Sequence, residues 1–573
     1  MIRHLLAIAA GSLLLAGCAG SPANLAAAPK AETRFAKGMV SAADPRAAEA
    51  GAEMLRAGGS ATDAALATLL ALTVVEPQSS GIGGGGFLVL DDGKGKIETI
   101  DGRETTPAAA TPHWFEVNGN VLSVPQAIPG GLSVGVPGNV RLMEMAHRNH
   151  GKLAWKTLFG PAIRLARDGF QVTPRLRQAL DRSRGTAALT PEGQALYYAS
   201  DGQPLPVGAT IRNPALAAFL DRLASEGPTA FYAGDNAARI AVAVATAPRN
   251  PAPMTSTDIG AYKAKARPPV CFAYRTYRIC GMGPPSSGAT TVGGILGLLE
   301  RFDMAALGKD SPVAWHLIAE AERLTYADRD RYLADADFIA VPVAGLLAPD
   351  YIAARSRLIA PDRAMATAAP GRPPGAPLAR ADTLNVDVPS TSHFVAMDSS
   401  GATVTMTSTI ESAFGSGLMA NGYYLNNELT DFSLAPERDG KTVANRVEAG
   451  KRPLSSMSPT LVYGQDGALR LAIGAAGGKT IPAQVAKAII GVIDWKLSAQ
   501  DAIALPLLFA PGGNAIYVEK GSTLEAMIPA LLALGHEDVT PRAMPLKANA
   551  IEVVGGIPAG AADPRSEGLA VSQ

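Results

Sequence analysis

The chain has 573 residues, of which 47% are hydrophobic and 18% are charged. This composition is typical of a globular protein with a large core and excludes an intrinsically disordered chain. The formal net charge is zero, so neither nucleic acid nor an anionic membrane surface is indicated as a partner.

The N-terminus predicts export from the cytoplasm. A short basic start precedes an apolar stretch of signal-peptide length, which is too short to span a bilayer comfortably. The stretch ends in the letters LAGC, which resemble the bacterial lipobox, so we expect residues 1–18 to be a lipoprotein-type signal peptide and Cys18 to be lipidated. A plain cleaved signal peptide is the alternative. We expect residues 19–37 to tether the lipid anchor to a periplasmic protein.

Two helices and a glycine-rich turn are the first predicted folded elements. Asp44-Pro45 is typical of a helix start, and Gly58-Gly59 ends that helix. A second helix, residues 62–75, is apolar almost all round and should be buried. The glycines at 83–86 precede a strand, which is the reverse of the order in a dinucleotide-binding turn and favours a structural role. Arg103, beyond the strand pair 87–101, is either a surface charge or a carboxylate clamp.

Cys271 and Cys280 flank a strand–turn–strand pattern centred near Arg275-Thr276. In an oxidising compartment such a pair favours a disulfide, and two buried free thiols are the alternative. The seven histidines are scattered, and the sequence has no HExxH, EF-hand or CxxC pattern. We therefore expect neither a metal site nor a cofactor.

Thr391 stands where a breaker-rich run, residues 361–380, gives way to a predicted β-hairpin. Cleavage before Thr391 would give this residue a free α-amine beside its hydroxyl, which is one known way to activate a weak nucleophile. An ordinary linker followed by an ordinary strand is the alternative.

A strand at 469–473, a glycine turn and a helix at 481–493 look at first like a P-loop. The Walker pattern needs four residues between its first glycine and Gly-Lys, whereas three separate Gly474 from Gly478. Nucleotide binding is therefore not expected. Backbone N–H groups at such a turn can still stabilise an oxyanion.

Five motifs, in family order, resemble those of γ-glutamyltransferases (glutathione hydrolases) of the N-terminal nucleophile hydrolase superfamily. They are VVEPQSSGIGGGGF at 74–87, TSHF at 391–394, NNELTDFS at 426–433, KRPLSSMSPT at 451–460 and AADPRS at 561–566. The resemblance implies an α+β fold, a four-layer αββα sandwich made as one precursor. It also implies self-cleavage between Ser390 and Thr391 into a large subunit, 38–390, and a small catalytic subunit, 391–573, that stay associated.

The family pattern further implies the chemistry of Thr391. Its hydroxyl would attack first its own chain and then a γ-glutamyl amide, with its α-amine as the base. Water or an amino acid or peptide acceptor would resolve the resulting ester. Gly477 and Gly478 match the oxyanion donors, and Thr409 matches the residue that positions the nucleophile.

Substrate recognition is expected to divide by charge. By resemblance, Arg103 clamps the donor α-carboxylate together with Ser455 and Ser456. Asp431 and Glu411 match the α-amino side, with Glu428 nearby; family members carry Asn or Glu at the Glu411 position. Expected donors are glutathione or other γ-glutamyl compounds.

Two other functions are weighed against this one. The family includes glutaryl-type cephalosporin acylases, and the retention of Asp431 argues against that activity because a glutaryl group has no amine to pair with it. A lipoprotein that keeps the fold only as a binding module is the remaining alternative. The segment Leu434–Gly450 is shorter than the lid of many bacterial members and has no aromatic residue, which predicts an open site that accepts bulkier donors or acceptors.

Overall fold

The computed structural model describes residues 35–377, 381–383 and 390–573. The predicted signal peptide, the lipidation site Cys18 and most of the tether lie outside the described residues. Within those residues no helix has the length and apolar character needed to cross a membrane. The same ranges contain no cluster of three or more His, Cys, Asp or Glu side chains suited to holding a metal ion.

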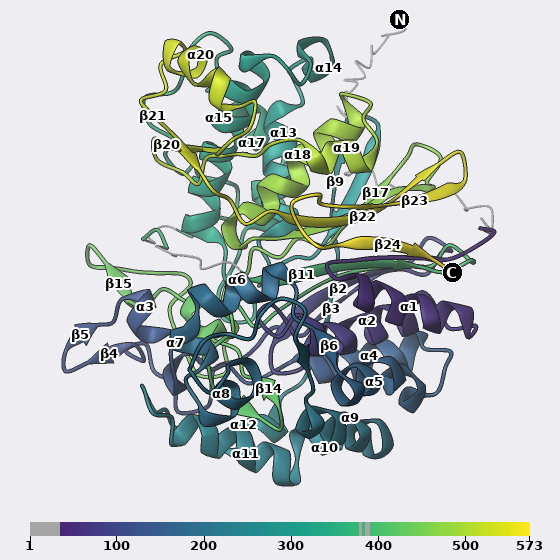
Figure 1. The fold of residues 1–573 in the computed structure, drawn as a ribbon. Helices are drawn as coiled ribbons and strands as arrows, with labels where there is room; N and C mark the ends of the chain where they lie inside the picture. Colours follow the sequence, from purple (N-terminus) through teal and green to yellow (C-terminus); the bar gives the residue numbers. More distant parts are fainter. Residues whose placement is uncertain (1–34, 378–380, 384–389) are drawn as a thin grey trace, which may run out of the picture.

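Two antiparallel sheets lie face to face at the centre of the molecule (Figure 1). The seven-stranded sheet has the spatial order β24 (Leu569–Ser572), β1 (Met39–Ala42), β11 (Thr391–Met397), β12 (Thr403–Thr409), β2 (Gly85–Asp91), β3 (Ile97–Asp101) and β8 (Lys265–Arg267). The six-stranded sheet has the order β23 (Ile557–Ala562), β22 (Lys547–Val554), β18 (Leu469–Ala476), β17 (Thr460–Tyr463), β10 (Tyr277–Gly281) and β9 (Val270–Tyr274).

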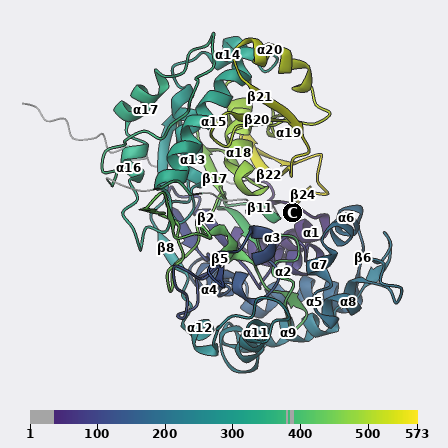
Figure 2. The ribbon, with the colours of Figure 1, turned by 90° about the vertical axis from the view of Figure 1, so that its left-hand side faces the viewer.

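Helices cover both outer faces of this pair of sheets (Figures 1 and 2). The seven-stranded sheet is covered by α1 (Pro45–Arg56), α2 (Ala61–Val75) and α4 (Asn139–His150), beyond which lie α5 (Gly160–Asp168), α9 (Pro214–Glu226) and α11 (Gly234–Ala245). On the other face, α13 (Gly288–Leu299) and α18 (Ile481–Ile493) pack on the six-stranded sheet, and α15 (Pro312–Tyr332) packs on α13. The predicted αββα sandwich is confirmed.

Several helices begin and end close to their predicted positions. The side chain of Asp44 caps α1, and every residue of α2 is buried, as its all-round apolar character predicts. Helix α18 has the predicted bounds. The segment Leu434–Gly450, for which no strand was predicted, contains a short exposed hairpin of β15 (Glu437–Arg438) and β16 (Lys441–Thr442).

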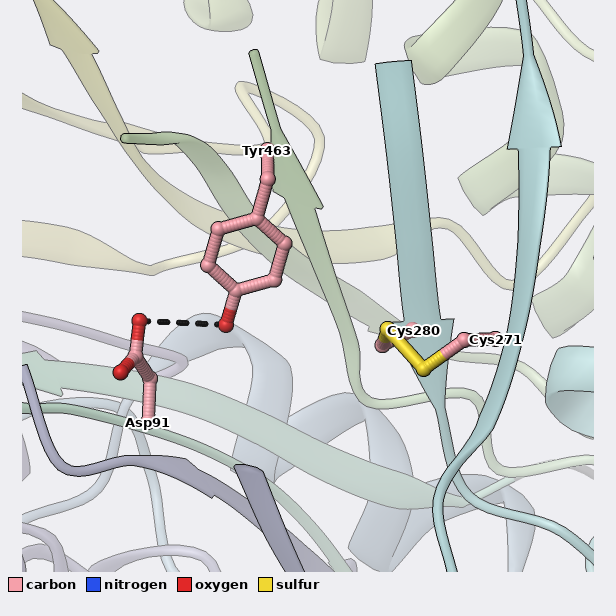
Figure 3. Close-up of a disulfide and its surroundings, with 4 residues drawn as sticks. All are labelled: Asp91, Cys271, Cys280 and Tyr463. Carbon is pink, nitrogen blue, oxygen red and sulfur yellow. Dashed lines mark hydrogen bonds between the residues drawn. A yellow bond between two sulfur atoms is a disulfide. The ribbon is translucent and has the colours of Figure 1, made fainter. Parts of the chain in front are cut away.

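A disulfide joins two strands within the six-stranded sheet, and a hydrogen bond joins the two sheets (Figure 3). Cys271 on β9 lies directly opposite Cys280 on β10, and their sulfur atoms are bonded at 2.10 Å. The Tyr463 hydroxyl of β17 donates a hydrogen bond of 3.1 Å to Asp91 of β2 and so links one sheet to the other.

The segments before and after Thr391 share both sheets. In the seven-stranded sheet β1 lies between β24 and β11, so a strand from before Thr391 is hydrogen-bonded on both sides by strands from after it. In the six-stranded sheet the two segments meet once, where β10 pairs with β17. Neither segment completes a sheet without the other.

Candidate functional site

Thr391 is the first residue of β11 and pairs with Thr409, the last residue of β12. The Thr391 hydroxyl lies 3.2 Å from the Thr409 hydroxyl and donates to it. Thr409 in turn donates to the carbonyl oxygen of Ser390 at 3.0 Å and accepts from the Glu411 N–H at 2.8 Å. One hydroxyl therefore contacts both the candidate nucleophile and the carbonyl of the bond before it.

This hydrogen-bond arrangement suits attack of the Thr391 hydroxyl on the Ser390 carbonyl. A donor aimed at a carbonyl oxygen stabilises the negative charge that develops there when the carbon is attacked. Ser390 is itself held in place, because its N–H donates to the Glu411 carbonyl at 2.9 Å and its hydroxyl donates to the Gln78 carbonyl at 2.6 Å.

The glycine run at 83–86 lets the backbone pass close to this site. A Cβ atom on Gly84 would lie 1.9 Å from the Thr409 carbonyl oxygen, and one on Gly83 would lie 2.0 Å from the Tyr424 carbonyl oxygen. No other residue type fits so close to a backbone atom. The structural role predicted for these glycines is confirmed.

A cavity opens to solvent beside Thr391. It brings together predicted site residues from widely separated segments, namely Arg103, Ser390, Thr391, Thr409, Glu411, Glu428, Asp431, Ser455, Ser456 and Gly478. Gly477 adjoins the cavity without lining it. The φ angles of Gly477 and Gly478 are +137° and +59°, values that favour glycine at this turn.

Arg103 pairs with two acids inside the cavity. Its side chain is 1% exposed, and its two Nη atoms contact the carboxylates of Glu428 and Asp431. Nη2 also donates to the Leu454 carbonyl at 2.9 Å. Burial by itself would lower the pKa of Arg103, but Glu428, Asp431 and Glu104 outweigh it and raise that pKa. In the free site Arg103 thus pairs with the acids expected on the amine side.

Two further buried acids surround this pair. Burial raises the pKa of Glu411 well above its usual value, and the nearby charges of Asp431 and Glu428 add to the effect. The Asn427 amide donates to Glu411 Oε2 at 2.6 Å. Burial, followed by the charge of Glu428, likewise raises the pKa of Glu104. Glu411 and Glu104 are therefore held towards their neutral forms, which limits the negative charge around Arg103.

His393 is close to Thr391 in sequence but does not line the cavity. Its ring nitrogens lie 2.8 Å from the Thr407 hydroxyl and 3.2 Å from the Thr405 hydroxyl. Burial lowers the pKa of His393 to about 3. Both ring nitrogens of the neutral imidazole contact hydroxyl groups of strand β12, so His393 is not a base for Thr391.

One charged residue that lines the cavity, Arg329 near the end of α15, was not among the predicted site residues. Its Nη2 donates to the Ser456 hydroxyl at 2.7 Å. The apolar residues Leu454, Met457 and Ile481 also line the site. The sequence around Arg329 is a run of charges of alternating sign, residues 328–331, at the end of α15, a pattern that usually indicates a solvent-exposed helix face.

Known proteins resemble this chain along most of its length. A family model described as Gamma-glutamyltranspeptidase matches residues 47–572. The Glutathione hydrolase proenzyme of Bacillus subtilis (strain 168) is 35% identical over 541 residues, which cover 92% of this chain and 90% of that protein. The Acylase ACY 1 proenzyme of Pseudomonas sp. (strain V22) is 34% identical over 515 residues, which cover 88% of each chain.

Among solved structures, that of a cephalosporin acylase from Bacillus halodurans superposes with a TM-score of 0.82 at 26% identity, covering 97% of this chain and 98% of the other. The similar proteins thus share one fold but carry the names of two activities, glutathione hydrolase and acylase.

Proposed function

Because this chain belongs to the gamma-glutamyltranspeptidase family of N-terminal nucleophile hydrolases, we propose that it is a γ-glutamyltransferase with glutathione hydrolase activity. Its donors are glutathione and other γ-glutamyl compounds, and its acceptors are water, amino acids or peptides. A glutaryl-type acylase is the second candidate, because acylases are among the similar proteins.

The Arg103–Asp431 ion pair beside Thr391 is the observation that favours γ-glutamyl donors. A γ-glutamyl group ends in an α-carboxylate and an α-ammonium. On binding, the carboxylate replaces Asp431 as the partner of Arg103, and the ammonium replaces Arg103 as the partner of Asp431. Each charge keeps a partner, so the cost of burying it stays low. A glutaryl group supplies only the carboxylate, so it would compete with Asp431 for Arg103 and provide no ammonium in exchange.

The proposed first reaction is self-cleavage. The Thr391 hydroxyl oxygen attacks the Ser390 carbonyl carbon while Thr409 stabilises the oxyanion. The bond from that carbon to the Thr391 nitrogen breaks, the nitrogen takes up the hydroxyl proton, and an ester forms. Water then hydrolyses the ester, which leaves Ser390 with a carboxylate and Thr391 with a free α-amine.

The same hydroxyl carries out the second proposed reaction. The new α-amine, with an ordinary pKa of about 7.7–8.0, accepts the hydroxyl proton. The Thr391 oxygen attacks the donor γ-carbonyl, and the N–H groups of Gly477 and Gly478 stabilise the oxyanion. The leaving amine departs with a proton, and water or an acceptor amine releases the γ-glutamyl group from the ester.

The proposal includes a periplasmic location with a lipid anchor on Cys18. The disulfide between Cys271 and Cys280 supports an oxidising compartment, because disulfides persist mainly outside the cytosol.

Self-cleavage is tested by denaturing gel electrophoresis and N-terminal sequencing of the purified protein. We expect two fragments, the smaller beginning Thr391-Ser392-His393. Thr391→Ala removes the nucleophile and should remain a single chain, whereas Thr391→Ser keeps a hydroxyl and should still be cut. A wild-type protein that stays whole, or a Thr391→Ala variant that is cut normally, would contradict the proposal.

The donor is tested by measuring kcat/KM for γ-glutamyl-p-nitroanilide and glutaryl-p-nitroanilide. One lost charged hydrogen bond corresponds to about 10- to 100-fold, so we expect at least about a 10-fold preference for the γ-glutamyl donor. Equal or faster turnover of the glutaryl donor would favour the acylase instead.

A further inference from the structure

Arg329 is a buried cation that reaches the cavity from α15. Its side chain is 2% exposed. Nε donates to the Ser287 hydroxyl at 3.0 Å, Nη2 donates to the Ser456 hydroxyl at 2.7 Å, and Nη1 lies 2.7 Å from the Asp330 carboxylate. The planar guanidinium is thus held in one orientation by contacts on all three nitrogens.

This contact determines what the Ser456 hydroxyl can do. A serine hydroxyl has one proton to donate and lone pairs that accept. Because Arg329 donates to the Ser456 oxygen, the hydroxyl proton must be directed to another acceptor. Ser456 lines the cavity, where a donor carboxylate would supply such an acceptor.

The loop that carries Ser456 is anchored to the same arginine by a second route. The Ser287 hydroxyl, which accepts from Arg329 Nε, donates to the Ser455 carbonyl at 2.8 Å. The Ser287 N–H also donates to that carbonyl at 2.7 Å. Arg329 therefore fixes both the backbone next to Ser456 and the direction of its hydroxyl.

The end of α15 also contacts the glycine turn on another side of the cavity. Asp330 bridges Arg329 to Lys479, whose Nζ lies 3.0 Å from its carboxylate. The Tyr326 hydroxyl donates to the Lys479 carbonyl at 2.5 Å. These contacts hold the end of α15, and with it Arg329, against the glycine turn.

We propose that Arg329 is a positioning residue for the donor α-carboxylate: it turns the Ser456 hydroxyl into the cavity as a hydrogen-bond donor to that group. The inference rests on the proposed γ-glutamyl activity and adds to it a specificity determinant outside the recognised motifs.

The test compares two donors in the wild type and in Arg329→Lys, which keeps the charge but loses the fork of donors. γ-Glutamyl-p-nitroanilide has the α-carboxylate, and 4-aminobutyryl-p-nitroanilide lacks it while keeping the amine. In Arg329→Lys we expect KM for the first donor to rise about 10-fold with kcat changing less than about 3-fold, because the lost contact is remote from the reacting bond. KM for the second donor should stay unchanged.

Ser456→Ala should reproduce this selective rise, and the double variant Arg329→Lys/Ser456→Ala should add little to it, because both changes remove the same contact. Ser287→Ala is a milder change that removes one anchor, and it should give a smaller shift in the same direction. It keeps the inference testable if Arg329→Lys fails to fold, since appearance of the two cleavage fragments reports folding of each variant.

Arg323→Lys is the matched control. Arg323 lies on the same helix, is also 2% exposed and bonds to Glu320 at 2.6 Å, but it does not line the cavity. This variant can lose stability, yet its ratio of KM values should match the wild type. If the ratio of the two donors' KM values in Arg329→Lys and Ser287→Ala equals that of the wild type, the inference about Arg329 is wrong, while the proposed function still stands. A wild type that turns over no γ-glutamyl donor overturns the proposed function as well.

Discussion

In the proposed function, Asp431 is the residue on which donor choice depends. It shares Arg103 with Glu428, but its side chain is 15% exposed, whereas the side chain of Glu428 is only 1% exposed. An incoming ammonium therefore reaches Asp431 more easily than Glu428. Since Glu411 is held towards its neutral form, Asp431 is also the natural anionic partner for that ammonium.

Asp431→Asn should weaken the enzyme selectively. Without the carboxylate the donor ammonium loses a charged hydrogen bond, so kcat/KM for γ-glutamyl-p-nitroanilide should fall about 10- to 100-fold. Turnover of glutaryl-p-nitroanilide should hold or rise, because no anion is left without a partner. The exposed Glu437→Gln is a charge-matched control. Equal losses for both donors would contradict this role of Asp431.

Single residues differ in how far sequence alone identifies them. Thr391 and Asp431 lie in motifs that resemble a known family, and Arg103 matches a family position outside those motifs, so their presence at one site could be predicted. Their mutual contacts could not be, because residues 103, 428 and 431 meet only after the chain has folded. Arg329 was missed for a related reason: a buried arginine on a long helix resembles any other helical arginine until its serine partners are known.

The glycine run at 83–86 packs against strand β12, and this contact sets the position of Thr409 relative to Thr391. Gly84 packs its Cα against the Thr409 carbonyl, and neighbouring Gly85 pairs with Thr409 across the ladder between β2 and β12. A side chain at 84 must therefore displace the end of β12.

Gly84→Ala should slow self-cleavage. Its methyl group would clash with a backbone atom that cannot rotate away, which moves Thr409 relative to Thr391 and costs about 1–3 kcal/mol of stability. The time course of fragment appearance on a denaturing gel and the thermal midpoint measure both effects. Gly185→Ala, where an added Cβ meets nothing within 4 Å, should change neither. Normal processing of Gly84→Ala would show that this contact does not set the geometry.

Elements with strong local signals were predicted well. The cap at Asp44, the apolar α2 and the turn before α18 are encoded by neighbouring residues, so their bounds follow from the sequence. The exposed hairpin at 437–442 was missed because short polar strands have no alternating apolar pattern. The order of strands within each sheet could not be predicted from neighbouring residues either, since β1 and β24 pair although they lie near opposite ends of the described chain.

The whole molecule is built so that a cut before Thr391 does not divide it. Strand β1 is hydrogen-bonded by β24 and β11, and the two sheets share the buried core between them. The site also draws on both segments, with Arg103 and Arg329 from one and Thr391, Asp431 and Ser456 from the other. The proposed cleavage therefore requires that the chain has already folded.

The processed protein should unfold in a concentration-dependent way. Its unfolded state is two separate chains, so mass action raises the thermal midpoint as protein concentration increases. Thr391→Ala has a single-chain unfolded state and should show the same midpoint at two concentrations tenfold apart. Calorimetry on both proteins makes the comparison, and a concentration-independent midpoint for the processed protein would contradict it.

The interleaved strands also determine how long the cleaved protein stays folded. Before the cut, an opened chain keeps its halves together and can close again by an intramolecular search. Afterwards the halves of an opened molecule diffuse apart, and in a dilute compartment their reunion becomes rare. The lifetime of the folded protein is then set by the rate at which the paired sheets separate. It is no longer set by an equilibrium between open and closed forms.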